Sequence, residues 1–158
     1  MIELVHMTGF LAAHAIWSVS SGETLIPMLG RERTGGQRDL VRFATPELGE
    51  GVARAKQTLD APEPGVARSV VVYDGRITLP TGKIDAVICE GRDHAGGASL
   101  VVAVPYRHAS SANGFAVHRP KFLEATDASP ATLDAFFVGV DSHSAAAPVW
   151  TRHLDQSL

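Results

Sequence analysis

The sequence has a single cysteine, Cys89, and few aromatic residues. One cysteine cannot form an internal disulfide, which excludes the disulfide-rich secreted proteins. Cys89 lies in an apolar run without a basic neighbour, and this setting predicts a buried, inert thiol rather than a nucleophile. Residues 1–6 also lack the positive charge that opens a signal peptide. We therefore expect a cytoplasmic protein.

Long hydrophobic runs and clusters of basic residues are absent too. The best apolar stretch, residues 10–17, is interrupted by His14 and is shorter than the roughly 18 residues of a membrane span. The formal net charge is -3 and the sequence pI is near 6.1. These features predict no nucleic-acid partner and no membrane partner. Basic residues are mostly arginine and alanine is abundant, which is typical of GC-rich bacterial genomes.

The motifs of common metal sites and enzymes are missing as well. None of the seven histidines has another histidine three to five residues away, and neither His-Glu-x-x-His nor Cys-x-x-Cys occurs. A site that joins the group from Cys89 to His94 with His108 and His118 would have to bridge strand ends about 20–30 Å apart. There is no Gly-x-Ser-x-Gly elbow. We expect neither a metal nor a cofactor.

The sequence does contain a run of short apolar strands with strong turn signals, from Val66 to Leu123. Ser69–Tyr73 and Arg76–Leu79 are separated by Asp74-Gly75, which predicts a type I′ hairpin turn. The alternative is one longer strand with a bulge at Gly75. A second reversal is expected at Pro80–Lys83, before the strand Ile84–Glu90.

The remainder of this run predicts an antiparallel meander. A glycine-rich loop follows residue 90, and the strand Ser99–Val104 is apolar on both faces, as a central strand is. Two more short strands, Phe115–His118 and Lys121–Glu124, are separated by Pro120, which marks an edge or a bent strand. Connections this short favour antiparallel neighbours.

Two strands and a helix are expected before the run. Thr8 is a candidate N-cap for a helix through Trp17 that closes at Gly22. The strands Thr24–Leu29 and Asp39–Ala44 follow, and Pro27 predicts a sheet edge for the first of them.

Two more helices flank the strand run. Thr45-Pro46-Glu47 is a strong helix start, and Ser129-Pro130 begins another helix whose apolar stripe should cover the sheet. Pro148 either ends that helix or opens a short terminal one carrying Trp150 and Leu154, which we expect to dock on this chain or on a second copy.

The element order predicts the fold class. Residues 1–158 are expected to form a single α+β domain with the order α-β-β-α-β(4-5)-α, in which helices pack on a mainly antiparallel meander sheet.

One polar cluster is a candidate binding site. Its members flank the same turn, so they should converge at one sheet edge, where arginine forks suit carboxylates and phosphates: Tyr106, Arg107, His108, His118 and Arg119. They would hold a small anion or an acidic segment of a partner protein. Solvated strand ends look the same in sequence and are the simpler interpretation. Asp85, inside an apolar strand, needs a partner if it is buried.

No motif assigns an activity. The first hypothesis is a non-enzymatic binding or interaction domain that forms a homodimer, because a complete structural pattern stands beside an absence of catalytic motifs. The alternative is a small hydrolase or transferase that uses the His/Arg/Tyr cluster on an anionic substrate. That alternative gains if these residues line one pocket and one histidine is hydrogen-bonded to a carboxylate, and it should be dropped if they point separately into solvent.

Overall fold

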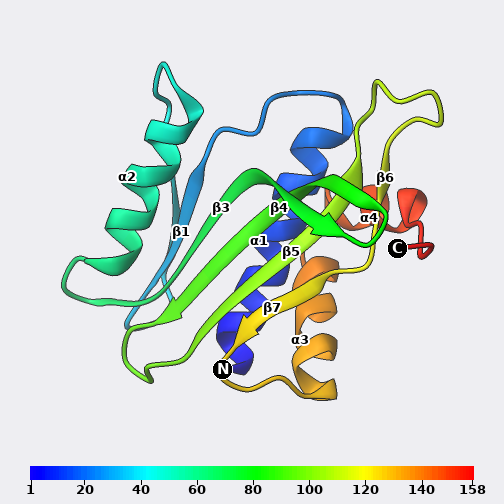
Figure 1. Ribbon diagram of the computed structural model, residues 1–158. Helices are drawn as coiled ribbons and strands as arrows, with labels where there is room; N and C mark the ends of the chain where they lie inside the picture. Colours follow the sequence, from blue (N-terminus) through cyan, green and yellow to red (C-terminus); the bar gives the residue numbers. More distant parts are fainter.

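A computed structural model describes all of residues 1–158 (Figure 1). Four helices and seven strands make up the fold. In chain order they are α1 (Ile2–Ser20), β1 (Met28–Arg33), β2 (Arg38–Arg42), α2 (Leu48–Asp60), β3 (Val66–Leu79), β4 (Gly82–Asp93), β5 (Ser99–Arg107), β6 (Ala116–Val117), β7 (Lys121–Ala125), α3 (Pro130–Asp141) and α4 (Ala147–His153).

All strand pairs in the sheet are antiparallel. The order is β2-β1-β3-β4-β5-β6, and β7 pairs with β5 beside β6. The predicted α+β class with an antiparallel sheet is confirmed. Pro120 separates β6 from β7 at the edge, as its missing N–H requires. The expectation that Pro27 marks an edge strand is wrong, because β1 begins at Met28 and lies between β2 and β3.

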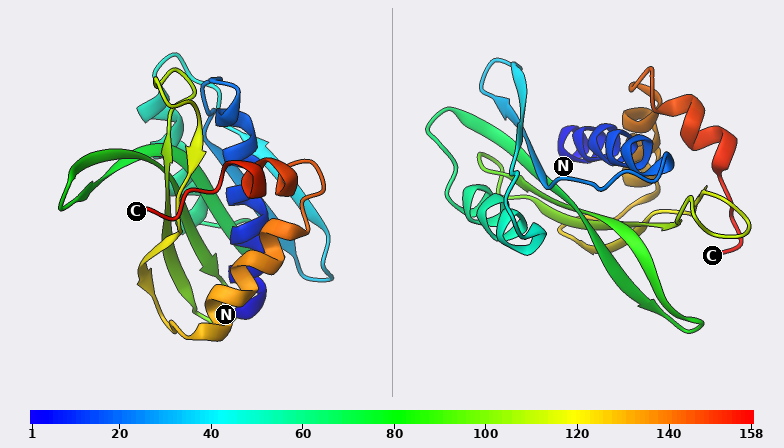
Figure 2. Two further views of the ribbon diagram at one scale, coloured as in Figure 1. Left: turned by 90° about the vertical axis from the view of Figure 1, so that its right-hand side faces the viewer. Right: turned by 90° about the horizontal axis from the view of Figure 1, so that it is seen from above.

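The predicted hairpin at Asp74-Gly75 is also wrong. β3 runs without interruption through both residues, which pair with Val87 and Ala86 of β4 in regular register, and Gly75 is not among the glycines with positive φ. The bulge of the alternative interpretation is absent as well. The chain reverses instead between Leu79 and Gly82, the second predicted turn, where Gly82 has a φ of 119°. The result is a long β3–β4 ribbon that projects beyond the sheet (Figure 2).

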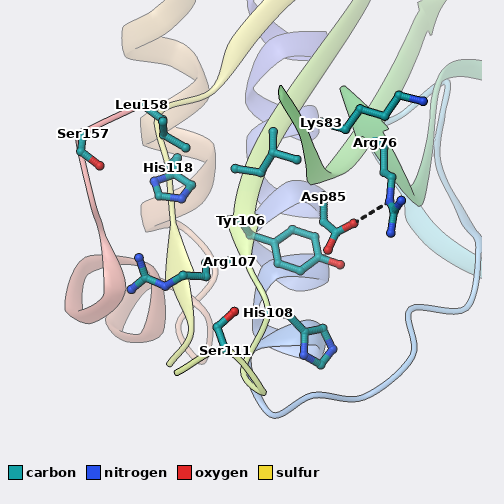
Figure 3. A pocket seen from close by; sticks show the side chains of 11 residues that line it. Arg76, Lys83, Asp85, Tyr106, Arg107, His108, Ser111, His118, Ser157 and Leu158 are labelled. Atoms are coloured by element: carbon teal, nitrogen blue, oxygen red, sulfur yellow. Dashed lines mark hydrogen bonds and ion pairs between the residues drawn. The ribbon is translucent and has the colours of Figure 1, made fainter. Parts of the chain in front are cut away.

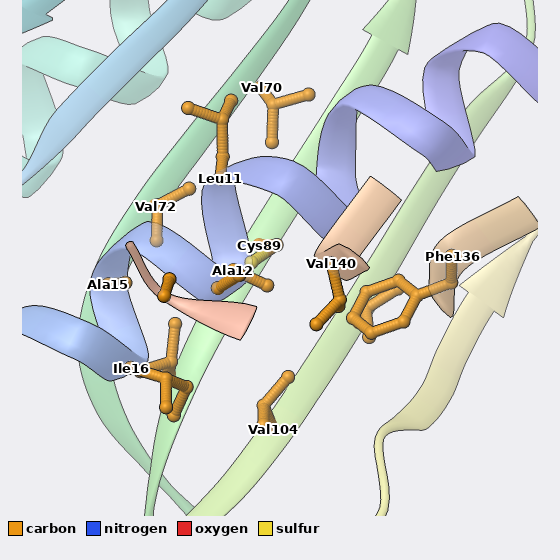
Figure 4. Close-up of a cluster of buried hydrophobic side chains, with 14 of the residues drawn as sticks. Leu11, Ala12, Ala15, Ile16, Val70, Val72, Cys89, Val104, Phe136 and Val140 are labelled. Atoms are coloured by element: carbon orange, nitrogen blue, oxygen red, sulfur yellow. The ribbon is translucent and has the colours of Figure 1, made fainter. Parts of the chain in front are cut away.

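Helix α1 is the central core element. It begins at Ile2, six residues before the predicted N-cap Thr8, whose hydroxyl donates to the Leu4 carbonyl oxygen instead. The helix ends as expected before Gly22, which has a φ of 87°. It lies across one face of the sheet, where Ala12 and Ile16 pack against Val72 and neighbouring core side chains (Figure 4).

By length and composition α1 is apolar enough to cross a membrane, which the shorter predicted helix was not. In the fold, however, 61% of the 18-residue apolar segment of this helix is buried. This burial is that of a core helix in a soluble domain. Location in the cytoplasm remains a prediction.

Helix α3 crosses α1 at very short range. A Cβ atom on Gly9 would lie 2.0 Å from the Phe136 carbonyl oxygen, and one on Gly139 would lie 2.0 Å from that of His6. Two glycines therefore let the helix backbones touch. The N-terminus of α3 carries the predicted cap, since Ser129 and Thr132 form a capping box. α3 packs beside α1 more than on the sheet itself.

Helix α2 covers part of the opposite face. Its Ala55 and Leu59 pack on Leu29 and Val71, which alternate along β1 and β3 with residues of the main core. Figure 2 shows α1 and α2 on opposite sides of the sheet.

The segment after α3 docks on its own chain. Trp150 of α4 is 3% exposed and contacts the rings of Phe136 and Phe137 edge-on. Beyond α4, Leu154 forms a parallel bridge with Val117 of β6. Pro148 thus opens a terminal helix, and Trp150 is not available to a second copy.

Candidate functional site

The predicted cluster lies at a cavity of about 460 Å³ (Figure 3). We call it the cationic cavity. One wall comes from the projecting β3–β4 ribbon, and the other comes from β5, the β5–β6 region and the last residues of the chain. Its lining residues are Arg76, Lys83, Ile84, Asp85, Tyr106, Arg107, His108, Ser111, His118, Ser157 and Leu158. Four of the five predicted residues are among them.

Tyr106 is a rigid floor of the cavity. Its side chain is 2% exposed and its hydroxyl donates to Asp74 Oδ1 at 2.8 Å. Burial and the adjacent Asp74 carboxylate raise the pKa of Tyr106, so it remains a neutral donor. Removal of solvent from the carboxyl group raises the pKa of Asp74, although the hydrogen bond from Tyr106 opposes this.

Arg107 is held by the chain around it. Its Nε donates to the Gly114 carbonyl oxygen at 2.8 Å, and its Nη1 lies 3.6 Å from Asp155 Oδ2. The Ser157 side chain and backbone hydrogen-bond the Asp155 carboxylate and lower its pKa. The guanidinium therefore has a carboxylate partner within the chain.

His118 is almost fully buried, with 3% of its surface exposed. Its Nδ1 lies 2.9 Å from the Asp155 carbonyl oxygen. A carbonyl oxygen only accepts, so Nδ1 carries the hydrogen, and in the neutral ring Nε2 is left with a lone pair. No hydrogen bond within the chain occupies that lone pair.

His108 is used locally. Its Nδ1 accepts a hydrogen bond from the Ser110 backbone N–H at 3.0 Å and lies 2.8 Å from the Ser110 hydroxyl oxygen. A ring nitrogen has one lone pair, so this Nδ1 is not free to take the proton of the serine hydroxyl. The pair lacks the arrangement of a base and a nucleophile.

The ribbon contributes residues that the sequence analysis did not place here. Arg76 Nε lies 3.1 Å from Asp85 Oδ1, while Lys83 makes no ion pair. Arg76 and Asp85 are direct partners across β3 and β4, as the predicted reversal at Pro80–Lys83 implies. The sequence did not show that this ribbon lies beside the strand end that carries Tyr106 and His108. Asp85 is paired with Arg76 but is only partly buried, so the burial that would have made a partner necessary is not present.

Arg119, the fifth predicted residue, lies outside the cavity. Its Nη2 donates to the Gln156 carbonyl oxygen at 2.9 Å, and its Nε donates to that of Leu158 at 3.3 Å. Together with His118 it holds residues 155–158 against β6. Arg119 therefore supports the wall of the cavity that the last residues of the chain form, without lining it.

The candidate metal ligands do not converge. No group of three or more His, Cys, Asp or Glu side chains is arranged to hold a metal ion. Cys89 is fully buried in the core under α1, and burial raises the pKa of its thiol. His94 instead hydrogen-bonds Ser69 at 3.1 Å, and Glu90 binds Lys56 at 2.8 Å.

The interpretation of this site rests on its own geometry. Three features define it: a paired Arg76 and Arg107, an unpaired Lys83, and the free ring nitrogen of His118. In comparison with known proteins, no family model, no curated protein and no solved structure matches the chain.

Proposed function

We propose that the protein is a binding domain that takes a small hydroxycarboxylate in the cationic cavity and does not transform it. The observation that carries this proposal is that Lys83, which is free of ion pairs, and His118, whose Nε2 has no partner in the chain, line the same cavity. An ammonium attracts a carboxylate, and a ring lone pair accepts a hydrogen bond from a ligand hydroxyl.

The charges of the cavity favour a ligand with one negative charge. Arg76 and Arg107 already face the carboxylates of Asp85 and Asp155. Lys83 is therefore the cation without a partner. A monovalent carboxylate balances it, whereas a phosphate dianion would have to displace an existing ion pair.

The arrangement supports binding over the hydrolase or transferase alternative. A carboxylate partner, which would favour a histidine base, is absent here: His118 donates to a backbone carbonyl oxygen, and His108 is occupied by Ser110. Tyr106 is held neutral by its surroundings. The cavity offers recognition groups without an activated nucleophile.

Lactate and propionate form the matched pair of probes, since they share a carboxylate and differ in one hydroxyl. In an amide NMR titration we expect both to shift the signals of Lys83 and Ser111, with lactate binding about fivefold more tightly, the worth of one net hydrogen bond. Equal affinities would show that His118 does not recognise the ligand hydroxyl. Tighter binding of inorganic phosphate than of lactate would show that the ligand is a phosphate and not a hydroxycarboxylate.

A charge reversal tests the site itself. Lys83→Glu should abolish lactate binding, because it replaces the unpaired cation by an anion. Lys121→Glu is the matched control: it changes the net charge equally, lies on β7, and replaces a lysine that also makes no ion pair. Equal losses in both variants would indicate general charge attraction and would overturn the proposal.

The proposal includes a homodimer. β2 is the last strand of the sheet on one side, so one row of its backbone groups has no partner strand. Its Arg38 and Arg42 side chains limit open-ended association. Native mass spectrometry is the direct test: a dimer supports this part, and a monomer at micromolar concentration removes it without affecting the cavity.

A further inference from the structure

A second cavity of about 380 Å³ lies between α1 and the β1–β2 hairpin. We call it the apolar cavity, because carbon atoms dominate its lining. It shares no residue with the cationic cavity. Its lining residues are Met7, Phe10, Leu11, His14, Gly30, Arg38, Asp39, Leu40 and His143.

A chain of polar contacts leads from this cavity, which His143 and His14 line, to Arg42, which shares a neighbouring cleft with His14. The Ala146 backbone nitrogen lies 3.2 Å from His143 Nδ1. His143 Nε2 lies 2.9 Å from His14 Nδ1, and His14 Nε2 lies 3.4 Å from Arg42 Nη2. Both ends of the chain, an amide N–H and a guanidinium, are donors only.

The number of donors exceeds the number of acceptors in this chain. Each neutral imidazole supplies one donor and one acceptor, so the two rings can complete only two of the three contacts. The Ala146 N–H is shared between the His143 carbonyl oxygen, at 3.1 Å, and His143 Nδ1. Because Nδ1 accepts, Nε2 donates to His14, and the remaining N–H of His14 faces the N–H of Arg42. This last contact is the longest of the three. Two donors therefore converge on a place that calls for an acceptor oxygen.

Neither donor is satisfied by a carboxylate of the protein. Arg42 makes no ion pair, although Glu23 lines the neighbouring cleft with it. Aromatic contacts fix the rings: Phe10 stacks on His143 at 4.7 Å, and Trp17 meets both histidines edge-on at 5.8 Å. The His14 donor is thus held in place before any ligand arrives, which lowers the cost of binding.

We propose that the apolar cavity binds a small carboxylic acid with an apolar body, whose carboxylate accepts hydrogen bonds from His14 Nε2 and Arg42. The body lies against Leu11 and Leu40, where it removes apolar surface from water. A cavity of this volume is within the range of small-molecule sites. The site is independent of the function proposed above.

Octanoate, octanol and acetate separate the two parts of the recognition. Octanol keeps the apolar body without the anion, and acetate keeps the anion without the body. In an NMR titration followed at the Trp17 indole and the His14 ring, we expect octanoate to bind about tenfold more tightly than octanol, as one charge-assisted hydrogen bond predicts. Acetate should bind far more weakly than either.

Arg42→Gln should weaken octanoate about tenfold and leave octanol unchanged. The residue is exposed, so the variant is expected to fold. Arg54→Gln, an exposed arginine on α2, is the matched control and should change neither ligand. Equal binding of octanoate and octanol, unaltered octanoate affinity in Arg42→Gln, or shifts at Lys83 in place of His14 would each overturn the proposal.

Discussion

The two cavities are built from different parts of the same fold. The cationic cavity lies where strands end, and its walls include the projecting ribbon and residues 157–158. The apolar cavity lies against α1, and Met7 and Leu11 in its wall are also core residues. Substitutions of exposed residues in the first, such as Lys83, should therefore change binding with small effects on stability. Substitutions in the wall of the second should change both together.

The largest effect is expected where α1 meets α3. Gly139→Ala places a methyl group 2.0 Å from the His6 carbonyl oxygen, which cannot move without bending α1. We expect a loss of about 3 kcal/mol in the free energy of unfolding, measured by urea denaturation. His143 lies two residues after the end of α3, so a displaced α3 should move its ring out of the apolar cavity. The protein that remains folded should therefore lose octanoate binding while it still binds lactate.

Gly49→Ala is the control for that substitution. Gly49 lies in the first turn of α2, and an added Cβ would meet no atom within 4 Å. We expect a gain of about 0.5 kcal/mol, because alanine restricts the unfolded chain. A loss at Gly139 as small as the effect at Gly49 would show that the helix crossing is not tight and that the apolar cavity does not depend on it.

Within the cationic cavity, His118→Leu should have the largest effect. It removes the donor to the Asp155 carbonyl oxygen, at a cost of about 1 kcal/mol, and removes the lone pair offered to the ligand. Lactate should then bind no better than propionate. Hydrogen exchange of the Asp155 amide, which donates to Val117, should become faster while octanoate binding stays unchanged. A parallel loss of octanoate binding would show that the cavities are coupled.

The fold was largely predictable because local patterns decide it. The capping box at Ser129 and the turns at Gly22 and Gly82 follow from side-chain and φ requirements that the sequence shows directly. Asp74-Gly75 misled because a favourable turn pair is only a local preference. Regular pairing with β4 outweighs it, as tertiary context commonly does.

The candidate site was predictable only in part, for a related reason. The strand ends on either side of one turn brought His108 and His118 to the same cavity, and sequence proximity shows this. Other parts of the site come from remote segments: Lys83 of the lining comes from the ribbon, and Asp155, which holds His118, comes from the last residues of the chain. The apolar cavity depends on a contact between His14 and His143, 129 residues apart, which no local pattern reveals.

Tyr106→Phe tests how the floor of the cationic cavity responds to pH. The variant removes the hydrogen bond to Asp74, at a cost of about 1 kcal/mol at neutral pH. The pKa of Asp74 is raised in the fold, so its ionised form costs stability at neutral pH and protonation relieves this cost. The variant raises that pKa further. Its destabilisation, measured by urea denaturation, should therefore shrink as the pH falls from 7 to 4, and a constant difference would contradict the role of Asp74.

The smallest effect concerns His14 and separates the cavities most sharply. Burial, then the charges of His143 and Arg42, lower the pKa of His14 below its ordinary value of 6.5. The unfolded chain therefore binds this proton first, and stability is lost as the pH falls from about 6.5 through the lowered pKa of the folded state. A carboxylate held beside the ring stabilises the protonated form, so octanoate should raise the pKa of His14 in an NMR titration of its Cε1–H signal. Lactate, bound in the other cavity, should leave it unchanged. If octanoate lowers this pKa, its apolar body alone fills the cavity and the carboxylate does not reach the two donors.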